Sequence, residues 1–308
     1  MKAVVATRRG GPEVLELKEY PEPVPSDNEV LIRVVRAGVN FADVQSTQGT
    51  YAAAPPPPFV PGLEVSGHEV KSNRPVMALL KSGGYSEVVA ADRRLVVPAD
   101  GLDLQQAGGY PLVSLTAYYA LHEVARLRDG ETVLVVPGAG GLGSASIHTA
   151  RALGAERVIA VASTEEKRKF ALGQGADVAV SYDEPWPSVD VVIDAVGGQA
   201  FTRGFEAVRQ LGRMVLLGMA SGQPPEIPGF GKLRQRNVGI LAFSFGALRS
   251  ADPDLVARTA PAAIELIRAG KVRPPVGQTL PFAEAGEAHR LLTSRKSVGK
   301  ILLAPSPD

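Results

Sequence analysis

Cysteine is absent from the 308 residues of the chain. Disulfides and thiolate–zinc sites are therefore excluded, and the composition favours an intracellular, cytoplasmic protein. An excess of charge is also absent, since 33 Lys and Arg residues stand against 32 Asp and Glu residues, for a net charge of +1. This balance argues against nucleic acid or an anionic membrane surface as a partner. The chain lacks the run of about 18 apolar residues that a membrane-spanning helix requires, so no membrane partner is expected.

The stretch Thr132–Gly143 (TVLVVPGAGGLG) is the most informative in the chain. Its first five residues are apolar and β-favouring, which indicates a strand buried on both faces, and Ser144–Leu153 continues as an apolar-striped helix. Between them, Gly138, Gly140 and Gly143 have the G-x-G-x-x-G spacing of a dinucleotide-binding turn. In such a turn the three glycines allow, in order, the tight bend, close approach of a pyrophosphate, and close packing of helix on strand. We therefore predict that the whole turn binds a cofactor (Gly138, Ala139, Gly140, Gly141, Leu142 and Gly143).

The pattern of apolar residues changes twice along the chain and predicts an α/β protein with two domains. Residues 1–116 have short strands and many turns, which is typical of an irregular β domain. Residues 117–248 alternate strands and helices, which indicates a doubly wound (Rossmann) parallel sheet. Residues 249–308 contain two helices and a closing strand, and we expect them to rejoin the first domain (Asp252–Ala269, Ala283–Leu292 and Lys300–Leu303).

Six short apolar strands are predicted for the doubly wound sheet. They are Thr132–Val136, Arg157–Val161, Val178–Ser181, Val189–Asp194, Met214–Gly218 and Val238–Phe243. The connection from Met214 to Val238 is rich in Gly and Pro and is expected to be an irregular loop. In the first domain, Lys2–Ala6 and Val14–Lys18 are predicted to form a hairpin. The four consecutive prolines Pro55–Pro58 within Tyr51–Pro61 predict a stiff surface loop.

The end of the second of these strands favours NADP(H) over NAD(H) as the cofactor. An acidic residue at this place would bind the ribose 2′-hydroxyl of NAD and repel the 2′-phosphate of NADP. The chain has Ala162 there, followed by the hydroxyl of Ser163 and the cations Lys167 and Arg168. Two glutamates, Glu165 and Glu166, lie between Ser163 and Lys167. The two cations could instead be solvated residues of a charged helix face. Because the missing acid carries more weight than the nearby cations, we predict NADP(H).

Motifs for other kinds of chemistry are missing from the sequence. The four histidines are far apart and are interpreted as structural or surface residues (His68, His122, His148 and His289). Without cysteine, a zinc site would need histidines and carboxylates at a spacing that is not found, so no metal is expected. Neither a Y-x-x-x-K pattern nor a G-x-S-x-G elbow occurs. Hydride transfer, in which the protein mainly positions a nicotinamide cofactor and a substrate, remains.

Several linked motifs occur in an order that is typical of one family. They are Asn40–Asp43 (NFAD), Tyr51 before the proline loop, Pro61–Gly67 (PGLEVSG), Gly84–Val89 (GYSEVV), Leu115–Tyr118 (LTAY), Gly138–Gly143 (GAGGLG), Val189–Gly198 (VDVVIDAVGG), Gly212–Gly218 (GRMVLLG) and Gly299–Leu303 (GKILL). On these residues the chain resembles, over essentially its full length, the medium-chain dehydrogenase/reductase superfamily and its zinc-free quinone oxidoreductase branch. The resemblance implies a GroES-like first domain. Zinc-dependent members have a Cys and a His where this chain has Asn40 and Leu63, so the resemblance implies no zinc.

The resemblance also implies a reaction, which is hydride transfer from NADPH to a small molecule, either a quinone or an activated alkene. It places Asn40 and Tyr51 at the substrate, where they would bind substrate oxygen or nicotinamide groups. Thr116 and Lys300 would lie near the cofactor. Three further residues match the positions that bind the adenosine phosphate (Ser163, Lys167 and Tyr182).

Each of these assignments has a structural alternative. Asn40 could stabilise a turn, and Tyr51 could anchor the proline loop. Thr116 could cap the helix that follows it. Lys300 could be an ordinary exposed lysine on a strand.

Departures from the family pattern leave a second reaction open. Some quinone reductases have a second tyrosine where this chain has Gln45, and an arginine near Ala242–Ser244 that is not found here. An NADPH-dependent alkenal, enone or enoyl-thioester reductase is therefore an alternative, and a nucleotide-binding protein without enzymatic activity is another. The family commonly pairs two Rossmann domains edge to edge, so the apolar strand Val238–Phe243 predicts a homodimer or a dimer-based tetramer.

Overall fold

The computed structural model describes residues 1–305 and divides the chain into two compact units. Unit 1 contains residues 1–113, 246–268 and those from Pro275 onward, and unit 2 contains residues 114–245 and 269–274. The predicted boundaries each lie three residues further along the chain (116 against 113, and 248 against 245). The short segment 269–274, which the sequence analysis assigns to the first domain, groups with unit 2.

Unit 2 is built on a six-stranded parallel sheet in the order β10-β9-β8-β11-β12-β13. Its strands are β8 (Thr132–Val136), β9 (Arg157–Val161), β10 (Val178–Val180), β11 (Val189–Asp194), β12 (Val208–Leu216) and β13 (Gly239–Ala242). The chain starts in the middle of the sheet with β8, winds to one edge, returns to β11 and winds to the other edge. This order confirms the doubly wound prediction.

One helix precedes the first of these strands, and others connect them. They are α3 (Pro111–Tyr118), which continues as a π-helical turn (Tyr119–Val124), α4 (Gly141–Ala152), α5 (Glu165–Gly173), α6 (Gly198–Ala207) and α7 (Phe230–Arg236). The presence of α7 corrects the prediction of an irregular connection between Met214 and Val238. This helix is short and has a basic residue at three of its positions, so it carries almost no apolar periodicity for a sequence pattern to detect.

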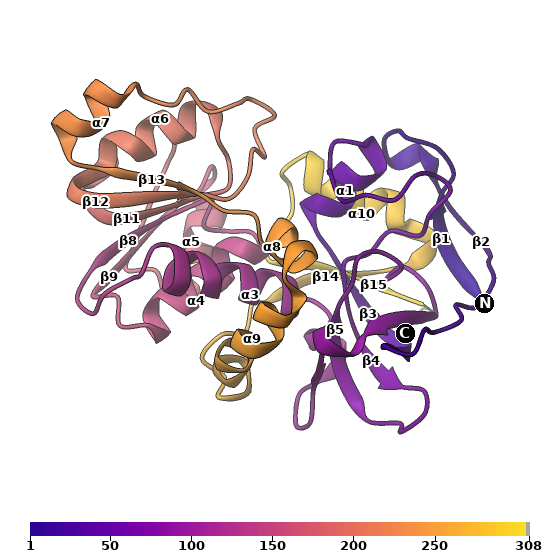
Figure 1. Cartoon of the computed structure of the whole chain (residues 1–308). Coiled ribbons are helices and arrows are strands. Elements are labelled where there is room, and N and C mark those ends of the chain that lie inside the picture. The colour runs from indigo at the N-terminus through magenta and orange to yellow at the C-terminus, as the bar shows by residue number, and fades with distance from the viewer. Residues whose placement is uncertain (306–308) are drawn as a thin grey trace. The chain divides into compact units, whose positions relative to one another are not determined.

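Alternate residues of the central strand β8 face two separate apolar cores. Val133 and Val135 pack in one core with residues of α4 and α5. Leu134 and Val136 pack in the other core with residues of α6, and α7 packs at its border. Figure 1 shows α4 and α5 on one face of the sheet and α6 and α7 on the other. Because helices cover both faces, β8 is apolar at every buried position rather than at every second one.

Unit 1 is built on a seven-stranded sheet with the path β14-β15-β3-β4-β5-β7, with β6 paired to β3. Its strands are β3 (Glu29–Val39), β4 (Glu64–Glu69), β5 (Pro75–Leu79), β6 (Val88–Asp92), β7 (Val96–Pro98), β14 (Val276–Pro281) and β15 (Lys300–Ala304). The C-terminal strand β15 pairs antiparallel with β3 and parallel with β14. The last segment of the chain therefore completes the sheet of the first unit.

The N-terminal hairpin is confirmed, because β1 (Lys2–Ala6) and β2 (Leu15–Glu19) pair antiparallel. The helices of this unit are α1 (Phe41–Gln48), α2 (Leu104–Ala107), α8 (Phe245–Ala251, which begins at the last residue of unit 2), α9 (Pro253–Arg268) and α10 (Ala285–Thr293). Short 3-10 turns occur at Pro12–Val14, Arg93–Leu95 and Phe282–Glu284. None of the helices in residues 1–305 combines the length and the apolar character that crossing a bilayer would take.

Candidate functional site

The glycine turn follows β8, and its three glycines differ in what a side chain there would meet. The backbone N–H of Gly138 donates to the Val161 carbonyl at the end of β9 (2.8 Å), and a Cβ on Gly138 would come within 2.6 Å of the Ala160 Cβ. A Cβ on Gly143 would come within 2.7 Å of the Gly138 carbonyl carbon. A Cβ on Gly140 would meet nothing within 4 Å. Gly138 and Gly143 are thus required by packing, whereas Gly140 borders open space.

The turn leads directly into the N-terminus of α4. Gly140 is the N-cap residue, and Gly141 and Leu142 are the first residues of the helix. The first N–H groups of a helix lack partners within the helix and carry a partial positive charge. A pyrophosphate placed against the open side of Gly140 would meet these groups, so the turn fits the phosphates of a dinucleotide. Ala139 is 4% exposed and is therefore buried within the turn region.

The residues predicted to bind the adenosine phosphate follow the two neighbouring strands. Ala162, after β9, is 2% exposed and its N–H donates to the Val180 carbonyl of β10 (3.0 Å). Ser163 is exposed directly after it, and Tyr182 lies two residues beyond β10. Because the carboxyl ends of neighbouring parallel strands share one edge of the sheet, the structure brings Ser163 and Tyr182 to the edge that carries the glycine turn.

Helix α5 begins at this edge and supplies the predicted cation. Thr164 caps the helix, since its Oγ1 accepts from the backbone N–H of Lys167 (3.2 Å). Lys169 forms an ion pair with Glu165 (2.7 Å), four residues earlier on the same helix. One glutamate of the first turn is therefore neutralised locally, which reduces the repulsion that a phosphate would meet beside Lys167.

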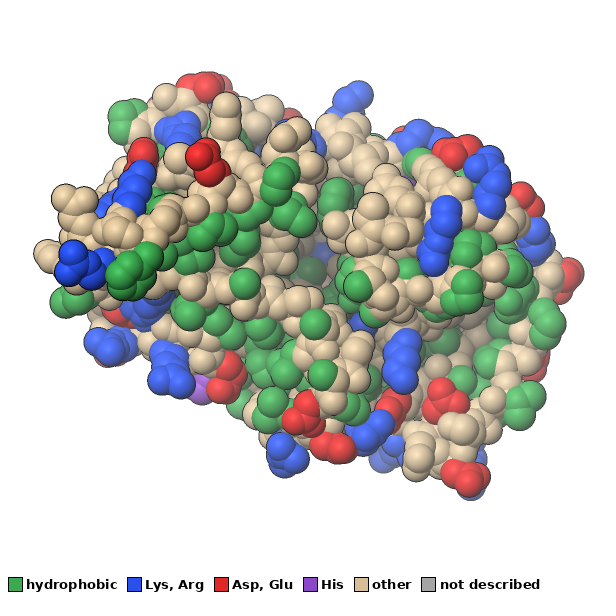
Figure 2. Space-filling view, turned by 45° about the horizontal axis from the view of Figure 1, so that its top comes forward, with side chains coloured by type: hydrophobic (Ala, Val, Ile, Leu, Met, Phe, Trp, Pro, Cys, Tyr) green, Lys and Arg blue, Asp and Glu red, His purple; other side chains and the backbone are tan. Residues whose placement is uncertain are grey.

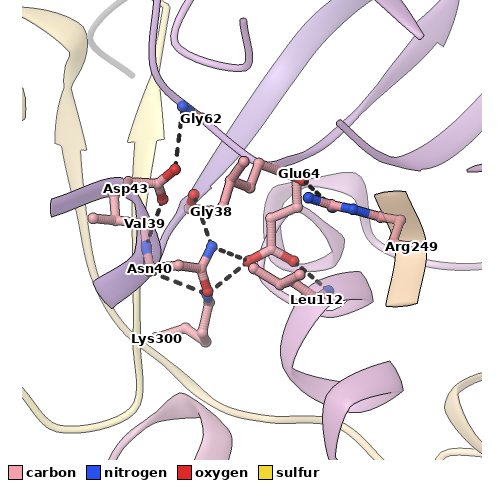
Figure 3. A network of polar contacts seen from close by, with 10 residues as sticks. Gly38, Val39, Asn40, Asp43, Gly62, Glu64, Leu112, Arg249 and Lys300 are labelled. Carbon is pink, nitrogen blue, oxygen red and sulfur yellow. Dashed lines mark hydrogen bonds and ion pairs between the residues drawn. The ribbon is translucent and has the colours of Figure 1, made fainter. Parts of the chain in front are cut away.

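A buried polar network lies in unit 1, where β15, β3 and β4 are neighbours (Figure 3). Lys300, at the start of β15, is 3% exposed. Its ammonium donates to Glu64 Oε1 (2.7 Å), to Asn40 Oδ1 (2.8 Å) and to the Val39 carbonyl (3.2 Å). All three of its N–H groups thus have acceptors. The alternative that Lys300 is an exposed strand lysine is wrong.

Asn40 and Glu64 complete this network. Glu64, which is fully buried, also accepts from Asn40 Nδ2 (2.8 Å) and from the backbone N–H of Leu112 in the first turn of α3 (2.8 Å). Asn40 Nδ2 also donates to the Gly38 carbonyl (3.3 Å). Both polar atoms of the Asn40 side chain therefore have partners inside the protein. Direct contact of Asn40 with a substrate stays a prediction.

Asp43 fixes the start of α1 beside this network. Its Oδ2 accepts from the backbone N–H of Asn40 (2.8 Å), and its Oδ1 accepts from that of Gly62 (3.2 Å). Complete burial raises the pKa of Asp43 to about 7. The Tyr85 hydroxyl lies 3.3 Å from His289 Nε2 and is also within hydrogen-bond reach of Asp43. Burial lowers the pKa of His289 to about 4, so this imidazole is neutral at neutral pH.

Tyr51 lies half-buried in the loop after α1, beside a cation that the sequence analysis does not identify. Arg249 of α8 is 4% exposed, and its Nε has no hydrogen-bond partner in the described part of the chain. Burial lowers the pKa of Arg249, opposed by a hydrogen bond with the Tyr51 side chain and by the charges of Asp43 and Glu64. A guanidinium only donates hydrogen bonds and a phenol can donate one, so the pair can bind an oxygen atom.

The sequence analysis does not assign a role to two of these functional candidates, Arg249 and Glu64. Arg249 stands five residues beyond the Ala242–Ser244 region in which an arginine is missing, in a helix that is not predicted. Glu64 belongs to a motif that carries the resemblance, but no role is assigned to it there. For Lys300 a signal did exist, because it begins the apolar strand KILLA, and a charge that is buried needs a partner.

Thr116 is placed inside α3, two residues before its end, and is half-buried. The chain continues from there into the π-helical turn, so the alternative that Thr116 caps a following helix is wrong. Its contact with a cofactor stays a prediction. Within unit 1 the structure thus groups Asn40 with Lys300, and Tyr51 with Arg249. Within unit 2 it groups the turn with Ser163, Lys167 and Tyr182 at one edge of the sheet.

Surface charge shows no concentration of one sign on the face drawn in Figure 2, where acidic and basic side chains are interspersed. Among residues 1–305, no three His, Asp or Glu side chains come together as metal ligands would.

Comparison with known proteins agrees with both units. The family model described as alcohol dehydrogenase GroES-like domain matches residues 26–89, and the one described as zinc-binding dehydrogenase matches residues 153–303. Quinone oxidoreductase-like protein 2 of Bos taurus is 30% identical over 98% of this chain and 92% of its own length.

Solved structures resemble the whole chain. The quinone oxidoreductase of Thermus thermophilus, whose structure in complex with NADPH is known, is 37% identical, with a TM-score of 0.85 over 99% of this chain and 100% of that one. The Escherichia coli quinone oxidoreductase, solved with NADPH, is 27% identical, with a TM-score of 0.87 over 99% of this chain and 100% of that one.

The fold and the glycine turn define a two-domain oxidoreductase of the dinucleotide-binding class. Within that class, the chain belongs to the medium-chain dehydrogenase/reductase superfamily, in its zinc-free branch. This membership confirms the resemblance that the sequence motifs indicate.

Proposed function

We propose that the protein is an NADPH-dependent, zinc-independent oxidoreductase that transfers hydride to a quinone. The single observation that carries the cofactor part is the turn after β8, in which Gly140 borders open space at the N-terminus of α4, while Ala162 rather than an acid stands directly after β9. These features fit a dinucleotide with a 2′-phosphate. The NADPH complexes of the similar quinone oxidoreductases support the same choice. We also keep the homodimer as a proposal, since β13 is the outermost strand of its sheet and leaves one edge unpaired within the described chain.

Different residues of the proposed site would bind different parts of the cofactor and the acceptor. The Gly138–Gly143 turn would hold the pyrophosphate, and Ser163, Lys167 and Tyr182 would surround the 2′-phosphate. Bound NADPH supplies the hydride. Tyr51 and Arg249 would donate hydrogen bonds to the carbonyl oxygen of the acceptor, on which negative charge develops when a hydride is added. Donors that are fixed in place stabilise such a charge better than water does, because they need no reorganisation.

The Asn40–Glu64–Lys300 network would support Tyr51 indirectly. Its members satisfy one another, so we propose that its main contribution is to keep α1, and hence the loop that carries Tyr51, in one conformation. For Asn40 or Lys300 to contact a ligand directly, one of these hydrogen bonds would have to break and be replaced by a hydrogen bond to the ligand. The predicted ligand contacts of Asn40 and Lys300 are therefore proposed as secondary to this role.

The test of the reaction is a panel of acceptors offered to the purified protein with NADPH. Oxidation of NADPH, followed by the loss of its near-ultraviolet absorbance, is expected with quinones and to a lesser extent with alkenals and enones. Turnover with alkenals, enones or enoyl thioesters but with none of several quinones would overturn the quinone assignment in favour of the double-bond reductase. Tight binding of NADPH without turnover on any acceptor would support the nucleotide-binding protein without enzymatic activity.

Lys167→Ala is expected to test the 2′-phosphate assignment. The loss of one charge-assisted hydrogen bond should raise the Kd for NADPH by about tenfold and leave that for NADH within about twofold. Lys169→Ala is the matched control, because it removes the same charge from the same helix but its ammonium is paired with Glu165. Binding is measured by nucleotide fluorescence titration. Equal losses of NADPH and NADH affinity in Lys167→Ala would contradict the assignment.

A further inference from the structure

The loop that carries Tyr51 is contacted by Arg9, and the Tyr51 phenol lies against Gly246. We infer that Arg9 and Gly246 are positioning residues for Tyr51, since Arg9 fastens the loop that carries it and Gly246 leaves the space that its phenol occupies. This inference rests on the proposed function in one respect only, which is that a fixed Tyr51 matters for acceptor binding.

Arg9 joins the chain before Tyr51 to the chain after it. Its Nη1 donates to the Ser46 carbonyl in the last turn of α1 (2.6 Å), and its Nη2 donates to the Pro55 carbonyl in the proline loop (2.7 Å). The guanidinium carbon lies 5.4 Å from the centre of the Phe59 ring, within the range of a cation–π contact. One planar guanidinium therefore links the backbone before Tyr51 to the backbone after it. A lysine, with a single point charge, could not do this.

The backbone between these two carbonyls is also fixed. Gly49 ends α1 in the left-handed conformation, with φ of 82°. The N–H of Tyr51 donates to the Gln45 carbonyl (3.2 Å), and that of Ala54 donates to the Tyr51 carbonyl (3.0 Å). A Cβ on Gly49 would lie 3.2 Å from Arg9 Cδ, so the glycine also makes room for the arginine. Tyr51 is thus presented from a tight turn rather than from an open loop.

The tip of Tyr51 rests on the backbone of α8 at Gly246. All three atoms closest to a Cβ built on Gly246 belong to the Tyr51 side chain, and the phenol oxygen is nearer to it than real Cβ contacts allow. Any side chain at position 246 must therefore displace the phenol, while no other described residue comes as close. Arg249, whose guanidinium interacts electrostatically with the Tyr51 side chain, follows on the same helix. Helix α8 thus presents a gap for the tyrosine and a cation beside it.

A double-mutant cycle between Gly246 and Tyr51 tests the first half of the inference. Tyr51→Phe is expected to lower kcat/KM for the acceptor about tenfold, as the loss of one hydrogen bond to a developing charge would. Gly246→Ala should cause a similar loss in the wild-type background and less than about a twofold further loss in Tyr51→Phe, since the clashing oxygen is then gone. If the two losses multiply, Gly246 acts through α8 itself and the inference is wrong.

Arg9→Met tests the second half, with Arg8→Met as the control, because Arg8 is exposed and next in sequence. We expect Arg9→Met to raise the acceptor KM severalfold while the Kd for NADPH is unchanged, and Arg9→Lys to restore little, because one ammonium cannot reach both carbonyls in the same geometry. Hydrogen exchange of the amides around Tyr51 should accelerate in Arg9→Met and not in Arg8→Met. Unchanged exchange in Arg9→Met would overturn the role of Arg9.

A spectroscopic readout separates this inference from the function on which it rests. In protein labelled with 13Cζ-tyrosine, the Tyr51 signal is assigned by its loss in Tyr51→Phe. It should shift in Gly246→Ala and broaden in Arg9→Met. If it does so while Tyr51→Phe turns over acceptors normally, the positioning stands and the proposed role of Tyr51 fails. If the signal stays unchanged in both variants, the positioning is wrong whatever the activities are.

Discussion

Lys300→Met is expected to destabilise unit 1 by about 3–5 kcal/mol, the range found when one partner of a buried ion pair is removed. Methionine matches the length of the lysine stem, so the loss reflects charge rather than volume. Glu64 would lose its 2.7 Å partner at a fully buried position, and Asn40 Oδ1 would lose its donor. Urea unfolding followed by circular dichroism measures the effect, because this signal reports on both units.

Two further variants identify the cause of that loss. Lys169→Met removes an ion pair whose side chains are 74% and 71% exposed, and it should cost less than about 0.5 kcal/mol. Adding Glu64→Gln to Lys300→Met should recover part of the stability, since the uncompensated charge is then removed. A Lys300→Met protein as stable as the wild type would show that the buried pair contributes nothing. A double variant less stable than the single one would show that the hydrogen bonds of Glu64, rather than its charge, are what matters.

The nucleotide-binding unit could be predicted from sequence in more detail than the first unit. Its strands are buried on both faces, so β8, β9 and β11 are mostly apolar, and their bounds agree with the predicted ones to the residue. The glycine turn could also be predicted from the sequence, because Gly138, Gly140 and Gly143 lie within a few residues of one another at the spacing that such a turn needs. Patterns that extend over a few neighbouring residues are therefore enough to predict this part of the fold.

The buried network could not be predicted in the same way. Lys300 is separated from Glu64 by 236 residues and from Asn40 by 260, and only the strand order β15-β3-β4 brings them together. No spacing in the sequence encodes that order. Arg249 was missed for a related reason, because α8 is short and its arginine is identified as part of a site only by its closeness to Tyr51.

Gly140→Ala and Gly143→Ala are expected to fail in opposite ways, although both replace a glycine of the same turn. Gly140 has φ of −91° and ψ of 178°, an extended conformation open to any residue, and a Cβ there meets nothing within 4 Å. The Gly140→Ala protein should therefore fold with normal stability. Its methyl group would occupy the space into which a pyrophosphate must come, and the Kd for NADPH should rise by at least about tenfold as contacts with the helix N-terminus are lost.

Gly143→Ala should instead lose about 3 kcal/mol of stability. Alanine is a better helix former than glycine by about 1 kcal/mol, so helix propensity alone predicts the opposite sign. The destabilisation comes from the Cβ, which would approach the Pro137 carbonyl oxygen and lie 2.7 Å from the Gly138 carbonyl carbon, both in backbone that cannot move without opening the turn. Thermal unfolding and NADPH titration of both variants separate the two effects. If Gly140→Ala binds NADPH as tightly as the wild type, the open side of the turn does not face the pyrophosphate, and the cofactor site must be sought elsewhere on the sheet edge.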